Sequence, residues 1–258
     1  MFSFKKNEMR YSKEHYTNMW NQYVKPHTPY PIPPYQEYVD RENFFEDYLD
    51  IFKGKDTRAE RGLPGPHPFE SYLFEYNPSL PSPKIYAIVI GEAAPDSSNQ
   101  TYFYNPTHLD KSKWLSSALT TFDIQINYPS TPEEKVAALY KLALNGFILL
   151  DLYPFNINFS TKVGNKKTRD SVDYESFWNN LANYIDDNLY GFVTKHEQWG
   201  VTDYLIYFSG PSKSFMDIQY QLHDQWRKDA FEHLLFPKDC SLYWASKDFQ
   251  IWDNILKN

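Results

Sequence analysis

The chain has little of several things that define common protein classes. It has one cysteine, Cys240, in 258 residues, so neither an internal disulfide nor a multi-cysteine metal site can form. Glycine is scarce, at 9 residues, which leaves few positions for strained loop conformations. No apolar run approaches the roughly 20 residues of a membrane-spanning helix. The N-terminal sequence MFSFKKNEMRYS lacks the apolar stretch of a secretory signal. We therefore expect a cytoplasmic protein that does not enter a membrane.

The sequence motifs of common cofactor sites are also missing. The 7 histidines form no HExxH pair, and neither GxGxxG, GxxxxGK[ST] nor GxSxG occurs. The sequence therefore predicts no metal and no cofactor, and it gives no support to a dinucleotide, P-loop or serine-hydrolase site.

The composition is that of a folded, mildly acidic protein. Hydrophobic residues make up 41% and charged residues 23%, and aromatic residues reach 19%. This balance excludes wholesale disorder. The formal charge of −7 argues against a surface that coats nucleic acid broadly, although a locally basic groove remains compatible with it.

Residues 1–83 are predicted to form a helical and proline-rich extension packed on the rest of the chain. Five prolines between residues 25 and 35 favour an extended arm, which either recruits partners or packs on the domain. We favour packing, through Tyr30, Ile32 and Tyr35. Residues 38–52 read as an amphipathic helix, and residues 54–83 as a long connection.

Residues 84–258 are predicted to be one α/β domain. The runs 85–90 and 146–151 are continuously apolar, as is typical of strands buried on both faces, and 203–208 and 240–244 read as further strands. Helices are predicted at 111–122, 131–146, 173–189, 212–228 and 247–256. Alternating strands and helices predict a three-layer α/β/α sandwich around a central parallel sheet of about four strands.

Ligands of such sheets bind beyond the carboxyl ends of the strands, which directs attention to the sequence GEAAPD after residue 90. Gly91 would let the chain turn, and Glu92 and Asp96 supply carboxylates that can hold or deprotonate a water. The aromatic residues Tyr102–Tyr104 offer flat faces for a base or sugar. An equally good interpretation is that Glu92 caps the following turn and that the aromatic residues belong to the core.

This segment resembles the first motif of the uracil-DNA glycosylase superfamily, in which a strand ends in G-E-x-P and an aromatic residue follows. The resemblance implies that acidic residues here position the attacking water and that Phe103, with Tyr104 beside it, stacks on the extruded base. Gly91 and Glu92 match the motif, whereas Ala93-Ala94-Pro95 is one residue longer before the proline. The resemblance covers roughly residues 84–256.

The second strand supports the resemblance in position but not in residue type. The superfamily has an asparagine there, which reads the edge of the base, whereas this chain has Asp151. An ionised aspartate only accepts hydrogen bonds, so it would favour a donor-rich base edge, act as a structural or catalytic carboxylate, or cap the next turn. Asn156 or Asn158 is the candidate for the missing amide.

Two further segments are candidates for phosphate contacts. Four positive charges lie between residues 162 and 169, where they either bind phosphate or form a solvated loop. Ser209 and Ser212 follow the third strand, where backbone N–H groups can meet an anion, unless Ser212 is simply a helix N-cap. The four charged residues are Lys162, Lys166, Lys167 and Arg169.

The last strand departs from the family pattern. Most members have a His-Pro-Ser-like loop whose histidine stabilises the departing base, but Trp244 stands near that position and only Ser246 matches. The indole offers one N–H donor and no positive charge.

Three functions remain open. The first is a uracil-DNA glycosylase-like hydrolase that excises a deaminated or damaged base from DNA or from a nucleobase-containing small molecule. The second is a non-catalytic nucleobase, nucleic-acid or partner-binding module on the same fold. The third is a different hydrolase that uses Glu92 and Asp151 on a small metabolite. We expect a monomer in each case.

Overall fold

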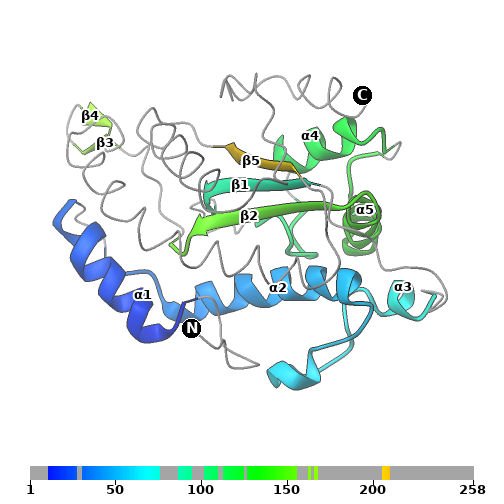
Figure 1. Cartoon of the computed structure of the whole chain (residues 1–258), viewed down its shortest axis with the longest axis horizontal. Helices are drawn as coiled ribbons and strands as arrows, with labels where there is room; N and C mark the ends of the chain where they lie inside the picture. The colour runs from blue at the N-terminus through cyan, green and yellow to red at the C-terminus, as the bar shows by residue number, and fades with distance from the viewer. Residues whose placement is uncertain are drawn as a thin grey trace.

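The computed structural model describes nine stretches of the chain, and its elements are shown in Figure 1. These stretches are 11–27, 31–75, 87–94, 102–109, 113–124, 127–155, 162–163, 166–167 and 205–209. The helices are α1 (Lys13–Met19), the π-helix η1 (Trp20–Val24), the 3₁₀ helices η2 (Lys25–His27) and η3 (Ala59–Arg61), α2 (Tyr35–Lys53), α3 (Glu70–Glu75), α4 (Lys113–Thr121) and α5 (Pro132–Leu144). The strands are β1 (Ala87–Ala93), β2 (Phe147–Tyr153), β3 (Lys162–Val163), β4 (Lys166–Lys167) and β5 (Leu205–Ser209).

Three of these strands form a parallel sheet in the order β2-β1-β5. They overlap the predicted strands at 85–90, 146–151 and 203–208. In the register of this sheet, Gly91 of the central strand lies opposite both Asp151 and Ser209. The two short strands β3 and β4 pair separately and antiparallel, with Lys162 opposite Lys167.

Helix α2 runs along the sheet beside β2 (Figure 1). The Tyr48 hydroxyl donates to the carbonyl oxygen of Phe147 at 2.5 Å. From the loop after β1, the Tyr104 hydroxyl donates to the carbonyl oxygen of Leu149 at 2.7 Å and accepts from its N–H at 2.6 Å. Backbone groups of alternate strand residues point to the same side, so the two tyrosines satisfy the edge of β2 that faces away from β1.

Helix α5 begins with the sequence Thr131-Pro132-Glu133-Glu134, which has the residues of a helix-capping motif. The Thr131 hydroxyl accepts a hydrogen bond from the Glu134 N–H at 3.2 Å, and Pro132 stands at the beginning of the helix. The Glu134 carboxylate accepts from the Ser130 N–H at 2.7 Å. These contacts satisfy donors that the first helical turn cannot bond internally. Because of them, the chain enters α5 at a defined residue.

The described residues differ from the predicted elements in three places. Residues 25–27 form a 3₁₀ turn and not an extended arm, which proline tolerates because an N–H is not needed in a first helical turn. Strand β1 continues through Gly91 to Ala93, so the glycine does not end it. The stretch 54–75 contains η3 and α3 and is not a plain connection.

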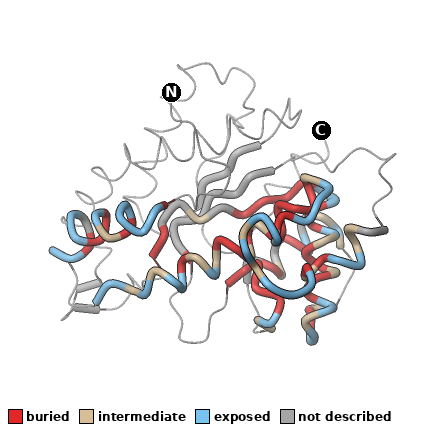
Figure 2. Tube along the Cα trace, turned by 90° about the horizontal axis from the view of Figure 1, so that it is seen from below, coloured by how far each residue is buried: buried red, intermediate tan, exposed pale blue. Residues whose placement is uncertain are grey.

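Buried and exposed positions alternate along the helices (Figure 2). In α2, Phe45, Tyr48, Leu49 and Phe52 are buried, whereas Phe44 is half-buried. Asp47 and Asp50 are buried as well, so α2 is covered on more of its surface than a simple amphipathic pattern indicates. The predicted helices at 173–189, 212–228 and 247–256 and the strand at 240–244 lie outside the described residues, and the three-layer sandwich stays a prediction.

Candidate functional site

The carboxyl edge of the parallel sheet brings three of the predicted residues into line. Gly91 is paired with Asp151 on one side and with Ser209 on the other. The chain goes from β1 to β2 on one flank and later to β5 on the opposite flank. In open α/β sheets, a reversal of this kind leaves a crevice at the carboxyl ends of the strands. The register therefore gathers Gly91, Asp151 and Ser209 where a ligand site is expected.

Two carboxylate residues belong to neighbouring strands at this edge. Glu92 follows Gly91 within β1, and Asp151 lies in β2, where it is half-buried. Seven of the predicted site residues lie outside the described residues. These are Asp96, Asn156, Asn158, Arg169, Ser212, Trp244 and Ser246.

The aromatic residues after β1 are buried in the core, which does not support their predicted role in stacking on a base, although the Tyr104 hydroxyl reaches Leu149, two residues from Asp151. Phe103 is 4% exposed and Tyr104 is 2% exposed. The ring of Phe103 lies 4.8 Å from Tyr104 and 5.9 Å from Phe147 at the start of β2. Asp151 lies four residues further along the strand, or about 13 Å at the rise of a β-strand. The alternative interpretation, in which these aromatic residues belong to the core, is the one that the structure supports.

A buried lysine holds this aromatic loop against α5. Lys135 is 3% exposed, and its Nζ donates to the carbonyl oxygen of His108 at 2.7 Å and to that of Tyr102 at 3.4 Å. Among the described residues, no carboxylate forms an ion pair with it. Burial therefore lowers the pKa of Lys135 to about 8.

Lys135 predicts an unusual dependence of stability on pH. Between about pH 8 and 10.5 the lysine is protonated in the unfolded chain but neutral in the folded one, so the free energy of unfolding rises with pH in this window. Replacing Lys135 by methionine keeps an unbranched side chain, one atom shorter and without the amine, and should abolish that rise. Chemical unfolding at pH 7.5, 8.5 and 9.5 tests this. The same slope in Lys135→Met would show that the rise comes from other groups.

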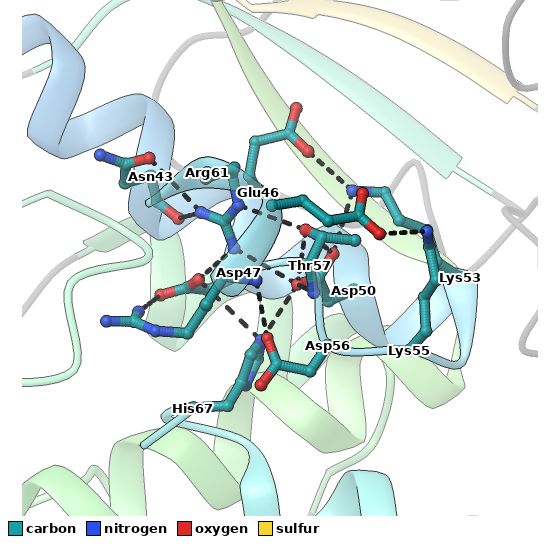
Figure 3. A network of polar contacts seen from close by, with 12 residues as sticks. Asn43, Glu46, Asp47, Asp50, Lys53, Lys55, Asp56, Thr57, Arg61 and His67 are labelled. Atoms are coloured by element: carbon teal, nitrogen blue, oxygen red, sulfur yellow. Dashed lines mark hydrogen bonds and ion pairs between the residues drawn. The ribbon is translucent and has the colours of Figure 1, made fainter. Parts of the chain in front are cut away.

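A network of charged side chains lies on the side of α2 away from its apolar residues (Figure 3). Asp47 and Asp50 come from α2, and their carboxylates face residues of the loop that follows it. Asp47 accepts hydrogen bonds from Arg61 Nη2 at 2.6 Å and from Arg58 Nη1. Asp50 accepts from Lys53 Nζ at 3.0 Å.

Asp50 is the centre of this network. Its Oδ2 accepts from the Thr57 N–H at 2.8 Å, and its side chain is completely buried. The His67 Nε2 lies 3.2 Å from the same oxygen, while His67 Nδ1 accepts the Phe69 N–H at 3.0 Å. Since Nδ1 is an acceptor, the ring proton is on Nε2 and is donated to Asp50.

The two carboxyl groups of the network have opposite pKa shifts. Burial raises the pKa of Asp47, although the hydrogen bond and charge of Arg61 and the charge of Arg58 oppose it. Burial also acts to raise the pKa of Asp50, but contacts with His67, Lys53 and Thr57 outweigh it and lower that pKa to about 2. Asp50 is therefore ionised throughout the physiological range.

The same residues bring three potential metal ligands together. One ligand atom each from Asp47, Asp50 and His67 lies within 4.8 Å of the others. Arg58 and Arg61 already donate to Asp47, and Lys53 and Thr57 to Asp50. Positive charge is thus already supplied to both carboxylates, and a cation would have to displace arginines. We interpret the network as a structural contact that fastens the loop 54–69 to α2.

Little in the amino-acid sequence indicates this network. Asp47 and Asp50 are three residues apart on α2, and Arg58 and Arg61 have the same spacing in the loop. Asp47 and Asp50 stand on the side of α2 away from its apolar residues, where charged side chains are usually solvated, so their burial has no local signal. His67 is 17 residues from Asp50, and only the path of the chain brings the two together.

Comparison with known proteins adds no further constraint on the site. Neither a family model, nor a curated protein, nor a solved structure matches this chain. Within the described part of the chain, no helix is both long enough and apolar enough to cross a membrane.

Proposed function

We propose that this chain hydrolyses the N-glycosidic bond of a deaminated or damaged base in DNA. The observation that supports the proposal is the register of the sheet, in which Gly91 lies beside Asp151 and Ser209 at the carboxyl ends of adjacent parallel strands. Glu92, directly after Gly91, belongs to the motif that resembles the uracil-DNA glycosylase superfamily. In this proposal, the Glu92 carboxylate orients a water and accepts its proton as the water oxygen bonds to the anomeric carbon. The bond from that carbon to the base nitrogen breaks, its electron pair leaves with the base, and the base then takes up a proton from solvent.

Recognition of the substrate needs groups other than the buried rings of Phe103 and Tyr104. In this proposal, Asp151 accepts hydrogen bonds from donors on the base edge, and Asn156 and Trp244 remain candidates outside the described residues. In the antiparallel pair of β3 and β4, Lys162 lies opposite Lys167. Lysines at paired positions of these two strands are candidates for contacts with the phosphates of DNA. The proposal includes a monomer that acts in the cytoplasm without a cofactor.

The direct test is product formation from a panel of oligonucleotides. Wild-type protein is incubated with DNA containing uracil, hypoxanthine or xanthine, and abasic product is measured after alkaline cleavage. Glu92→Gln should reduce the rate about 100-fold, as expected for loss of a general base, whereas Glu60→Gln on the exposed surface should leave it unchanged. Folded wild-type protein that releases none of the three bases would refute the proposal.

One observation favours a second candidate, a binding module without catalysis. Enzymes that extrude a base usually hold it between aromatic or apolar side chains, and burial of Phe103 and Tyr104 removes the two predicted rings. Fluorescence titration with single-stranded DNA at increasing salt separates the two functions. Salt-sensitive binding that gives no abasic product and is unchanged in Glu92→Ala would establish the binding module.

A further inference from the structure

Aromatic residues of the N-terminal helices surround Phe155, which lies two residues after the end of β2. Phe155 is 0% exposed, and its ring lies 4.4 Å from Tyr16 of α1 and 5.2 Å from Trp20 of η1. Tyr16 and Trp20 are themselves 1% and 2% exposed. We call the group of aromatic residues around Phe155 the aromatic clamp. It consists of Tyr11, Tyr16, Trp20, Tyr35, Tyr38 and Phe155.

Hydrogen bonds connect the clamp to the chain segments that carry it. The Tyr16 hydroxyl donates to the carbonyl oxygen of Pro33 at 3.0 Å, which ties α1 to the proline-rich stretch. The Tyr35 hydroxyl donates to the carbonyl oxygen of Tyr11 at 2.8 Å, and the Tyr11 N–H donates to the Tyr38 hydroxyl at 3.0 Å. These bonds restrict the rings to one arrangement, so the clamp is a built structure and not a loose hydrophobic contact.

Arg41 forms a hydrogen bond to Pro154, the residue before Phe155. It belongs to the first half of α2, and its Nη2 donates to the carbonyl oxygen of Pro154 at 2.7 Å. Near the other end of β2, Tyr48 of the same helix binds the carbonyl of Phe147. Helix α2 therefore runs antiparallel to β2 and holds both of its ends. The carboxyl end is held by Arg41 and by the clamp, only three to four residues from Asp151.

We propose that the N-terminal segment 11–41 is a positioning element of the ligand site at the carboxyl edge of the sheet. By fixing Pro154 and Phe155, it sets the position of Asp151 and the starting point of the lysine-containing segment that follows. Arg41 and Phe155 act on the ligand through these residues and are positioning residues. The ligand part of this inference, that the segment affects ligand binding, rests on the proposed function. The mechanical part, that the segment holds the carboxyl end of β2 in place, does not.

Amide hydrogen exchange tests the mechanical part. In Arg41→Met, the amides of residues 151–153 and 155 should exchange about tenfold faster or more, because a charge-assisted hydrogen bond is lost. Arg41→Lys, which keeps a donor, should restore most of the protection. Arg58→Met is the matched control, since it breaks an ion pair at the other half of α2 and should not change exchange at these residues. Unchanged exchange in Arg41→Met, or equal acceleration in Arg58→Met, would overturn the inference.

Binding of a uracil-containing oligonucleotide tests the ligand part. Arg41→Met and Phe155→Leu should weaken binding about tenfold while the fold is retained, and Arg58→Met should bind as the wild type does. Faster local exchange with unchanged affinity would show that the clamp is structural only, and would overturn the positioning role. If the wild type neither binds nor cleaves the oligonucleotide, the proposed function fails, while the exchange experiment still decides whether the clamp holds this strand end.

Discussion

Replacing Asp50 by asparagine is expected to lower the free energy of unfolding by about 3–5 kcal/mol, the range for breaking one side of a buried ion pair. Asp50 is 0% exposed and accepts from the Thr57 backbone N–H, the Thr57 hydroxyl and Lys53. The variant removes the negative charge and leaves Lys53 and Arg61 without that partner. Urea denaturation at pH 7 measures the loss.

The pH dependence of this difference gives a second measurement. The pKa of Asp50 is lowered from 3.8 to about 2 in the folded chain, so its stabilisation is complete above pH 3.8 and is lost as the pH falls toward 2. The difference in the free energy of unfolding between wild type and Asp50→Asn should therefore become smaller below about pH 4.

An exposed ion pair provides the control for Asp50. Lys55 and Glu60 have side chains that are 54% and 50% exposed, and such pairs contribute about 0–1 kcal/mol. Glu60→Gln should accordingly have almost no effect on the free energy of unfolding. If Asp50→Asn were as mild as Glu60→Gln, the network would not fasten the loop to α2, and the metal interpretation of the same residues would deserve a direct binding experiment.

Replacing Tyr104 by phenylalanine is expected to cost about 2–4 kcal/mol, because it leaves two buried backbone groups without a partner. The hydroxyl both donates to the Leu149 carbonyl oxygen and accepts from the Leu149 N–H. The ring is retained in the variant, so its packing against Tyr48, at 4.6 Å between ring centres, is kept. Thermal and urea unfolding both measure the effect.

Tyr48 supplies a matched comparison for Tyr104. Its hydroxyl makes one bond to the same strand, to the carbonyl oxygen of Phe147, so Tyr48→Phe should cost about half as much, or about 1–2 kcal/mol. Both side chains are buried, with exposures of 0% and 2%, and the substitutions are identical. A Tyr104→Phe variant no less stable than Tyr48→Phe would contradict the assignment of these hydroxyls to the edge of β2.

The strands and the helix cap were predictable because their signals are local. The apolar runs 85–90 and 146–151 overlap β1 and β2, and Thr131 caps α5 as its sequence indicates. The end of β1 was misplaced, because Gly91 reads as a turn residue, whereas here it is paired on both sides inside a sheet. Strand pairing is a long-range property that a glycine does not reveal.

The candidate site was only partly predictable for a related reason. In this chain, aromatic residues reach 19%, and an aromatic residue after a strand is equally compatible with a ligand platform and with the core. Phe103 and Tyr104 belong to the core because of their distant partners, Phe147 and Leu149. The network around Asp50 likewise depends on where the loop 54–69 returns to α2.

The hydroxyls of Tyr48 and Tyr104 also limit how the sheet can grow. A strand that paired outside β2 would need the backbone groups of Phe147 and Leu149, which these hydroxyls already bind. These hydroxyls therefore block the pairing of a further strand along the first half of β2, from Phe147 to Leu149.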